Sequence, residues 1–170
     1  MTQSHISKEL QVAIEASRRA EECIMGYYRH NVTVEKKADA TPVTIADREA
    51  EALIKHILHE HFPNYGFLGE ESGKTSSAGT KIWIVDPIDG TKNFIRGIPL
   101  FGILIGLMEN GVCIVGVSNV PGMQDIVWGQ RETGAFWNGE PVRVSDIESL
   151  SKSMISLGGI KHLEKRNDGQ

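Results

Sequence analysis

Apolar positions in the first third of the chain recur with the period of an α-helix. One apolar stripe covers residues 7–28, and polar side chains occupy the other faces. A second stripe follows Thr44, which has the spacing of a capping pair with Asp47. This second stripe ends at residues 62–64, where a proline interrupts it. The pattern predicts two amphipathic helices before residue 65.

Beyond residue 64 the pattern changes to alternating or continuous apolar runs, which are typical of strands. Asn-Gly pairs at 110–111 and 138–139 indicate tight turns between such runs, and the first is a strong hairpin signal. Residues 73–80 (GKTSSAGT) are polar and predict a flexible loop. The predicted strands are Tyr65–Gly69, Lys81–Asp86, Gly102–Met108, Val112–Val117, Ile126–Gly129 and Ala135–Trp137.

Two helices followed by several adjacent strands predict an α+β fold, described equally as a layered α/β sandwich. The two N-terminal helices would pack on one face of a largely antiparallel sheet. We expect one domain over residues 1–160 and a polar tail over residues 161–170. The sheet's other face would then expose apolar side chains, so a homodimer formed through it is a further expectation.

Composition narrows the function classes. The chain has 170 residues, 40% of them hydrophobic, and 18 basic against 22 acidic side chains give a net charge of -4. A basic excess, the usual mark of nucleic-acid binding, is missing. The apolar runs fall short of the ~20 residues that span a bilayer. The two cysteines are far apart and the first residues resemble no secretory signal, so we expect a cytoplasmic protein without membrane or nucleic-acid partners.

Acidic residues cluster where predicted strands end. Glu70 follows one strand, and Asp86 and Asp89 follow the next, separated by a proline that stiffens the turn. Carboxylates held at one sheet edge repel one another unless a cation lies between them. Ligands of oxygen alone favour Mg²⁺, with Mn²⁺ as an alternative, over zinc. A Glu-Glu or Asp-Gly pair alone is more often surface or turn, but the string Asp86–Thr91 (DPIDGT) is far more specific.

Gly90 and Thr91 supply the second half of the predicted site. Glycine lets a ligand approach the backbone closely. Thr91 would open a helical turn over residues 92–96, whose first N–H groups attract anions. A carboxylate-bound metal beside an anion-binding turn is the arrangement of metal-assisted phosphoryl transfer.

Three segments resemble the inositol monophosphatase family, the lithium-sensitive, Mg²⁺-dependent phosphatases. They are residues 41–47 (TPVTIAD), 69–72 (GEES) and 86–94 (DPIDGTKNF), and the resemblance extends to about Leu157. It implies a Mg²⁺-dependent phosphomonoesterase that hydrolyses a small phosphorylated alcohol with a metal-activated water. It also implies inhibition by lithium.

The resemblance assigns metal ligands residue by residue. Glu70 would bind the first metal and help to orient the attacking water. Asp86 would bridge two metals, and the carbonyl of Ile88 would complete the first site. Asp89 would hold the second metal. These roles are chemically consistent with catalysis that needs no covalent intermediate.

The resemblance also assigns the phosphate site and a catalytic threonine. The N–H groups of Gly90 and Thr91 would bind phosphate oxygens beside Asp89. The hydroxyl of Thr91, hydrogen-bonded to Asp47, would position or deprotonate the water. Lys37 is a weaker candidate for a place near the phosphate.

Residues 91–97 (TKNFIRG) favour one substrate within the family. The pattern is closer to histidinol-phosphate phosphatases than to inositol phosphatases, which carry a His near the position of Arg96. Histidinol phosphate is therefore the first expected substrate and inositol monophosphate the second, with other sugar phosphates also open. The alternative is that Arg96 is an ordinary surface charge.

The sequence departs from the family in one respect. The family has a second α/β half with a Trp-Asp motif that ligates the second metal, whereas none of the three tryptophans here precedes an Asp. We therefore expect the N-terminal portion of a family member, without the second α/β domain. The alternative function is a catalytically inactive fragment that binds metal and phosphate, or a partner chain.

Histidines 56, 59 and 61 invite a metal-site interpretation. The apolar stripe of the second helix uses other positions, so these side chains should face outward. A solvated helix face is the favoured interpretation.

Overall fold

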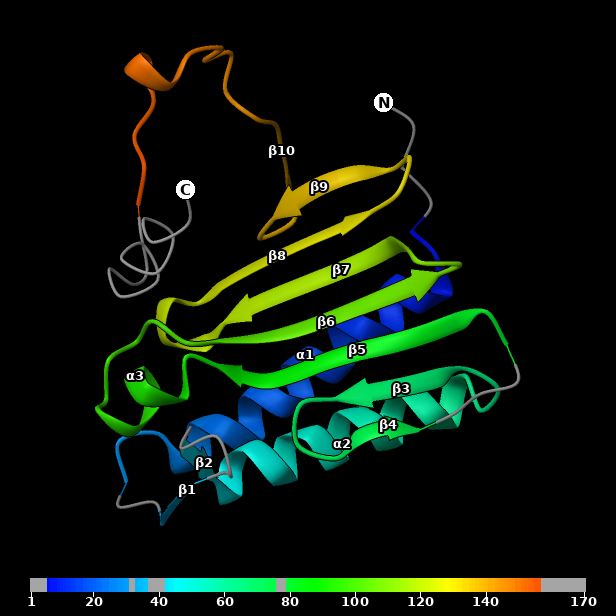
Figure 1. Cartoon of the computed structure of the whole chain (residues 1–170), viewed down its shortest axis with the longest axis vertical. Helices are drawn as coiled ribbons and strands as arrows, with labels where there is room; N and C mark the ends of the chain where they lie inside the picture. Colours follow the sequence, from blue (N-terminus) through cyan, green and yellow to red (C-terminus); the bar gives the residue numbers. More distant parts are fainter. Residues whose placement is uncertain (1–5, 31–32, 37–41, 76–78, 157–170) are drawn as a thin grey trace, which may run out of the picture.

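Two long helices cover one face of a mixed sheet in the computed structural model, which describes residues 6–30, 33–36, 42–75 and 79–156. Helix α1 spans Lys8–Tyr27 and helix α2 spans Ile45–His61. They pack against each other and against the central strands, as Figure 1 shows. The predicted α+β fold, with helices on a largely antiparallel sheet, is confirmed.

Both helices begin at the side-chain caps that their sequences provide. The hydroxyl of Ser7 accepts the N–H of Leu10 at 3.2 Å at the start of α1. At α2, Asp47 Oδ2 accepts the backbone N–H of Thr44 at 2.7 Å and its hydroxyl at 2.6 Å. Such bonds satisfy donors that the first helical turn leaves unpaired. The predicted capping pair is therefore present, and it fixes the start of α2.

The main sheet has eight strands in the order β10-β9-β8-β7-β6-β5-β3-β4. Neighbouring strands are antiparallel except β3 and β5, which are parallel. Strands β1 (Val34–Lys36) and β2 (Pro42–Thr44) form a separate pair before α2. The main strands are β3 (Gly66–Gly69), β4 (Gly73–Thr75), β5 (Lys81–Asp89), β6 (Gly102–Glu109), β7 (Val112–Val120), β8 (Asp125–Gln130), β9 (Gly134–Trp137) and β10 (Glu140–Val142).

Three short helices complete the described elements. They are α3 (Thr91–Ile95) and the 3₁₀ turns η1 (Pro121–Met123) and η2 (Leu150–Lys152). The predicted hairpin turns are present, because Asn110 and Gly111 have φ of 51° and 81° and Asn138 and Gly139 have φ of 50° and 91°. Positive φ at both turn positions matches the twist of the flanking strands.

The structure differs from the sequence prediction in two places near the site. Residues 73–75 form the edge strand β4 rather than a loop, because pairing with β3 orders this polar segment. Strand β5 continues beyond Asp86 to Asp89, so the second aspartate ends the strand instead of following it. Lys37 and the expected tail at 161–170 lie outside the described residues.

The core lies between the helices and the sheet. Alternate residues of β6 point into it, and Ile103, Ile105 and Leu107 are all buried. The opposite face of the sheet carries apolar side chains that are partly exposed, including Leu68 and Ile84 at 36%. No helix in the described part of the chain is both long and apolar enough to cross a membrane.

Candidate functional site

The parallel pairing of β3 and β5 brings the predicted acidic residues to one edge of the sheet. Gly69 pairs with Val85 at the end of the ladder. The backbone N–H of Glu70 then donates to the carbonyl of Val85 at 3.1 Å. Glu70 therefore follows β3 beside Asp86 of β5. Residues from separate segments meet here because parallel strands end at the same edge.

The carboxyl group of Asp86 lies in an environment that disfavours its charge. Its pKa is raised from 3.8 to about 8, first by burial and then by the hydrogen bond and negative charge of Glu70. The charge of Asp89 adds to this shift, while the N–H of Ile88 opposes it. Three acidic side chains thus interact at this edge, and a cation would relieve their repulsion.

An irregularity in β5 orients Asp86 relative to Asp89. The register with β6 shifts between these two residues. Within this segment, the N–H of Ile88 donates to Asp86 Oδ1 at 3.1 Å, and the Ile88 side chain is buried. Irregularities of this kind re-aim side chains at strand ends. The buried Ile88 side chain therefore anchors the segment that contains Asp86 and Asp89.

Gly90 makes the turn that joins β5 to α3. Its φ of +91° is in the left-handed region, which favours glycine. A Cβ at this position would lie 3.0 Å from the carbonyl oxygen of Leu100. The carbonyl of Gly90 accepts the N–H groups of Asn93 at 2.8 Å and Phe94 at 3.1 Å. The predicted helical turn is present as α3, displaced by one residue at each end.

The hydroxyl of Thr91 connects this turn to helix α2. Thr91 Oγ1 lies 3.1 Å from the carbonyl oxygen of Ile88 and 3.4 Å from Asp47 Oδ1. Asp47 is only 2% exposed, and its other oxygen caps α2. The structure therefore contains the Thr91–Asp47 contact that the sequence resemblance implies. One buried carboxylate fixes both the helix start and the threonine.

Glu51 is a residue of the site that the sequence reasoning missed. It lies on α2 and is 2% exposed. Its carboxylate accepts the backbone N–H of Glu71 at 2.7 Å and that of Ser72 at 2.8 Å. A Cβ on Gly69 would overlap the same carboxylate. Glu51 thus hydrogen-bonds to the two residues after Glu70 and lies close to the residue before it. One signal was available, because Glu51 shares the helical stripe of buried Ile54 and Leu58.

The acidic edge opens onto a shallow cavity of about 720 Å³ on the helix-free face of the sheet. Glu70 and Asp86 lie at one side of it. The remaining wall is largely apolar and includes Leu68, Leu104 and Val127. The site therefore combines charged oxygens with an apolar surface.

The donor set fits a hard divalent cation. The side chains that interact at this edge are carboxylates, and Mg²⁺ prefers oxygen ligands. In the described ranges, no three Asp, Glu, His or Cys side chains are grouped closely enough to form a complete metal site. Mg²⁺ commonly uses one or two carboxylates and completes its shell with water and phosphate oxygens. The histidines at 56, 59 and 61 are exposed, as predicted.

The fold and the site define a layered α+β protein with an acidic site at the end of its parallel strand pair. The model of the inositol monophosphatase family matches residues 5–169, and the chain belongs to this family. It is 41% identical over 151 residues to a histidinol-phosphatase of Chlorobaculum parvum, which covers 88% of this chain. It is 37% identical to an inositol monophosphatase of Mesembryanthemum crystallinum, again over 88% of this chain.

Solved structures agree with this assignment. The extragenic suppressor protein suhB of Bartonella henselae superposes with a TM-score of 0.79 at 35% identity, over 83% of this chain. The IMPase of Thermotoga maritima gives a TM-score of 0.77 at 35% identity, over 82% of this chain. The chain spans 58% of the Chlorobaculum relative and 56% of the Bartonella structure.

Proposed function

We propose that this chain carries the metal- and phosphate-binding part of a Mg²⁺-dependent phosphomonoesterase. The observation that carries the proposal is the interaction of Glu70, Asp86 and Asp89 at one strand edge, directly before the Gly90 turn. The family and the names of its relatives support phosphate-ester chemistry. A hard cation at this edge would neutralise phosphate charge and lower the pKa of bound water.

The residues around the cation site have separate roles in this proposal. Glu70, Asp86, Asp89 and the carbonyl of Ile88 would hold the metal ions. Glu70 would also orient the attacking water. The Ile88 carbonyl already accepts the Thr91 hydroxyl at 3.1 Å, so the threonine lies close to the metal-binding groups.

Thr91 and the turn before it would handle the water and the phosphate. The backbone N–H groups of Gly90 and Thr91, next to Asp89, would receive phosphate oxygens. The Thr91 hydroxyl would position the attacking water. Asp47 would accept the proton of this hydroxyl or hold the hydroxyl in its orientation. Burial of Asp47 supports this role, because a carboxylate with fixed partners orients its neighbours.

The expected substrates are histidinol phosphate first and inositol monophosphate second. The Chlorobaculum relative is named a histidinol-phosphatase, and a 39% identical relative in Mycobacterium tuberculosis carries the same name. Inositol monophosphatases match at slightly lower identity, such as 37% in Mesembryanthemum crystallinum. Both substrates are small phosphorylated alcohols.

Phosphate release tests this proposal. The chain is incubated with histidinol phosphate or inositol 1-phosphate, with Mg²⁺ or with EDTA, and free phosphate is measured with malachite green. Asp89→Asn should lower the rate by at least about 100-fold, as expected when charge stabilisation of the reaction is lost. Asp146→Asn, at an exposed position far along the chain, is the matched control.

Calorimetry with Mg²⁺ separates two remaining outcomes. Metal binding without phosphate release would favour the non-catalytic alternative, a module that binds metal and phosphate. If the chain neither binds Mg²⁺ nor releases phosphate, the proposal is contradicted. Inhibition by lithium is expected for any active form.

A further inference from the structure

A second cavity lies on the helix-covered side of the sheet, away from the acidic site. It has a volume of about 570 Å³ and is formed by the carboxyl-terminal half of α2, the connection over residues 62–65, the start of β3, and single residues of β4 and β5. None of the candidate metal or phosphate ligands lines it. Strand β3 begins at this cavity and ends at Gly69, directly before Glu70. The volume is within the range of small-molecule sites in proteins.

Aromatic rings form a packed wall of this cavity. The rings of Phe62 and Tyr65 are stacked with centroids 5.0 Å apart and an interplanar angle of 18°. Trp83 lies behind them, 5.8 Å from Phe62 and 6.4 Å from Tyr65. Because the rings hold one another, this wall exists before any ligand binds. A planar apolar group would bury its surface against it.

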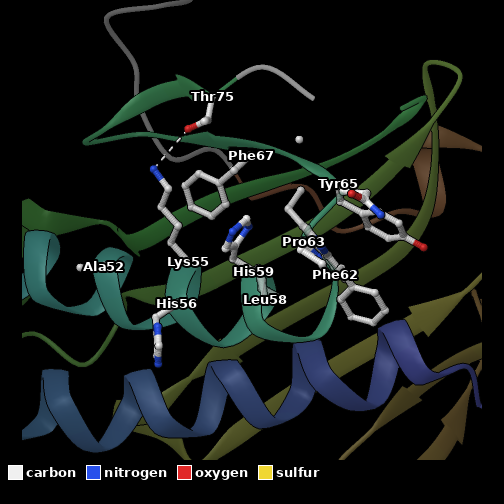
Figure 2. A pocket seen from close by; sticks show the side chains of 13 residues that line it. Ala52, Lys55, His56, Leu58, His59, Phe62, Pro63, Tyr65, Phe67 and Thr75 are labelled. Atoms are coloured by element: carbon white, nitrogen blue, oxygen red, sulfur yellow. Dashed lines mark hydrogen bonds between the residues drawn. The ribbon is translucent and has the colours of Figure 1, made fainter. Parts of the chain in front are cut away.

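The polar groups at the opposite side are cationic or neutral. Lys55 Nζ donates to the hydroxyl of Thr75 at 3.2 Å and lies 5.1 Å from the centre of the Phe67 ring. Figure 2 shows Lys55 and His59 on the same side of α2 as Phe67, whereas His56 points away. No Asp or Glu is among the described residues that line the cavity. Lys55 therefore has no carboxylate partner among these lining residues.

We propose that this cavity binds a small aromatic carboxylate. The ring would lie against Phe62 and Tyr65, and the carboxylate would accept from Lys55, with a ring N–H of His59 as a second donor. A neutral hydrophobe would leave the ammonium without an anionic partner. A bare anion would leave the aromatic wall uncovered. The Lys55 ammonium and the aromatic wall together therefore select a ligand that has both a carboxylate and an aromatic ring.

Trp83 also lines the cavity and carries a buried polar atom. The indole N–H of Trp83 is buried and has no hydrogen-bond partner among the described residues. Trp83 lies behind the Phe62 and Tyr65 rings, so the proposed ligand would cover this wall without reaching the indole N–H.

Binding of phenylacetate to the full chain tests the proposal. Amide chemical shifts in ¹H–¹⁵N NMR spectra locate the site, and calorimetry gives the affinity. We expect a dissociation constant on the order of 1 mM, as for a small ligand with one charged contact. The shifts should be concentrated in residues 55–67. Phenylacetamide, which lacks the charge, and acetate, which lacks the ring, should each bind about tenfold more weakly.

Two variants identify the residue responsible. Lys55→Gln should weaken phenylacetate binding by about tenfold. Lys74→Gln, an exposed lysine on β4 that does not line the cavity, removes the same charge and should leave binding unchanged. Lys74 is exposed and Lys55 is half-buried, and glutamine keeps much of the length of each side chain, so neither variant should impair folding. The proposal is overturned by absence of saturable binding, by equal affinity for phenylacetamide, or by equal effects of the two variants.

Discussion

The carboxylate of Glu51 on helix α2 accepts the backbone N–H of Glu71 at 2.7 Å, and thereby fixes the residue that follows Glu70. Its second oxygen accepts the N–H of Ser72 at 2.8 Å. The buried Glu51 carboxylate thus fixes the segment that follows β3. Residues that do not bind a metal themselves but contact its ligands commonly hold those ligands in place.

Glu51→Gln should therefore weaken metal binding without removing a metal ligand. The amide can accept at one oxygen only, so one of the two N–H groups loses its partner. We expect the affinity for Mg²⁺ or Mn²⁺ to fall by about tenfold or more. The amides of Glu71 and Ser72 should also exchange hydrogen faster.

Titration calorimetry and hydrogen-exchange mass spectrometry measure these two effects. Glu60→Gln is the matched control, because Glu60 is exposed on the same helix. If exchange at Glu71 and Ser72 is the same in both variants, Glu51 does not hold this segment.

Gly90→Ala should destabilise the chain. The position has φ of +91°, and a Cβ would lie 3.0 Å from the Leu100 carbonyl. Strain of this kind costs about 1–3 kcal/mol of unfolding free energy. Urea unfolding followed by circular dichroism measures the loss.

Gly111→Ala is an informative control, since Gly111 also has positive φ but no atom lies within 4 Å of the added Cβ. A cost no larger than that of Gly111→Ala would show that the contact with Leu100 is harmless.

The sequence predicted the parts of the fold that local patterns encode. Helical stripes, the Thr44–Asp47 cap and the Asn110–Gly111 turn are local, and each is present. The acidic residues were found because a strand followed by a carboxylate is also a local pattern. Strand β4 was missed because its three residues become ordered only by pairing with β3.

Long-range contacts explain what the sequence left out at the site. Glu51 precedes its partners by 20 and 21 residues, so no short motif links them. The second cavity combines α2 with β3, β4 and β5 and likewise has no sequence signature. Both features depend on how α2 packs against the sheet.

An ion pair between α1 and β5 should make stability depend on pH. Lys81 Nζ lies 2.9 Å from Glu9 Oε1, and the Tyr65 hydroxyl donates to the same oxygen at 3.0 Å. Burial alone would raise the pKa of Glu9, but hydrogen bonds from Lys81 and Tyr65 outweigh it, so the pKa is lowered from 4.5. A carboxyl group with a lowered pKa contributes stability above its unfolded pKa and loses it as pH falls through the folded one.

Glu9→Gln should therefore cost about 1 kcal/mol at pH 7 and much less near pH 3. Urea unfolding at both pH values measures the difference. Glu15→Gln, at an exposed position of the same helix, should show no such pH dependence. An equal cost of Glu9→Gln at both pH values would mean that the charge of Glu9 does not contribute.

The helix-free face of the sheet should mediate self-association. Leu68 and Ile84 are 36% exposed and Val127 is 41% exposed, and all three line the shallow cavity beside the acidic site. Contiguous apolar surface of this kind favours contact with another chain. Sedimentation velocity over a range of protein concentrations should therefore show dimers or larger species.

The double variant Ile84→Lys/Val127→Lys should shift the distribution to monomer, because two charges would have to be desolvated in the contact. Val144→Lys is the control for added charge, since Val144 is 94% exposed and lies outside this face. A chain that stays monomeric at every concentration, or a double variant that associates as the control does, would exclude this face as the contact surface.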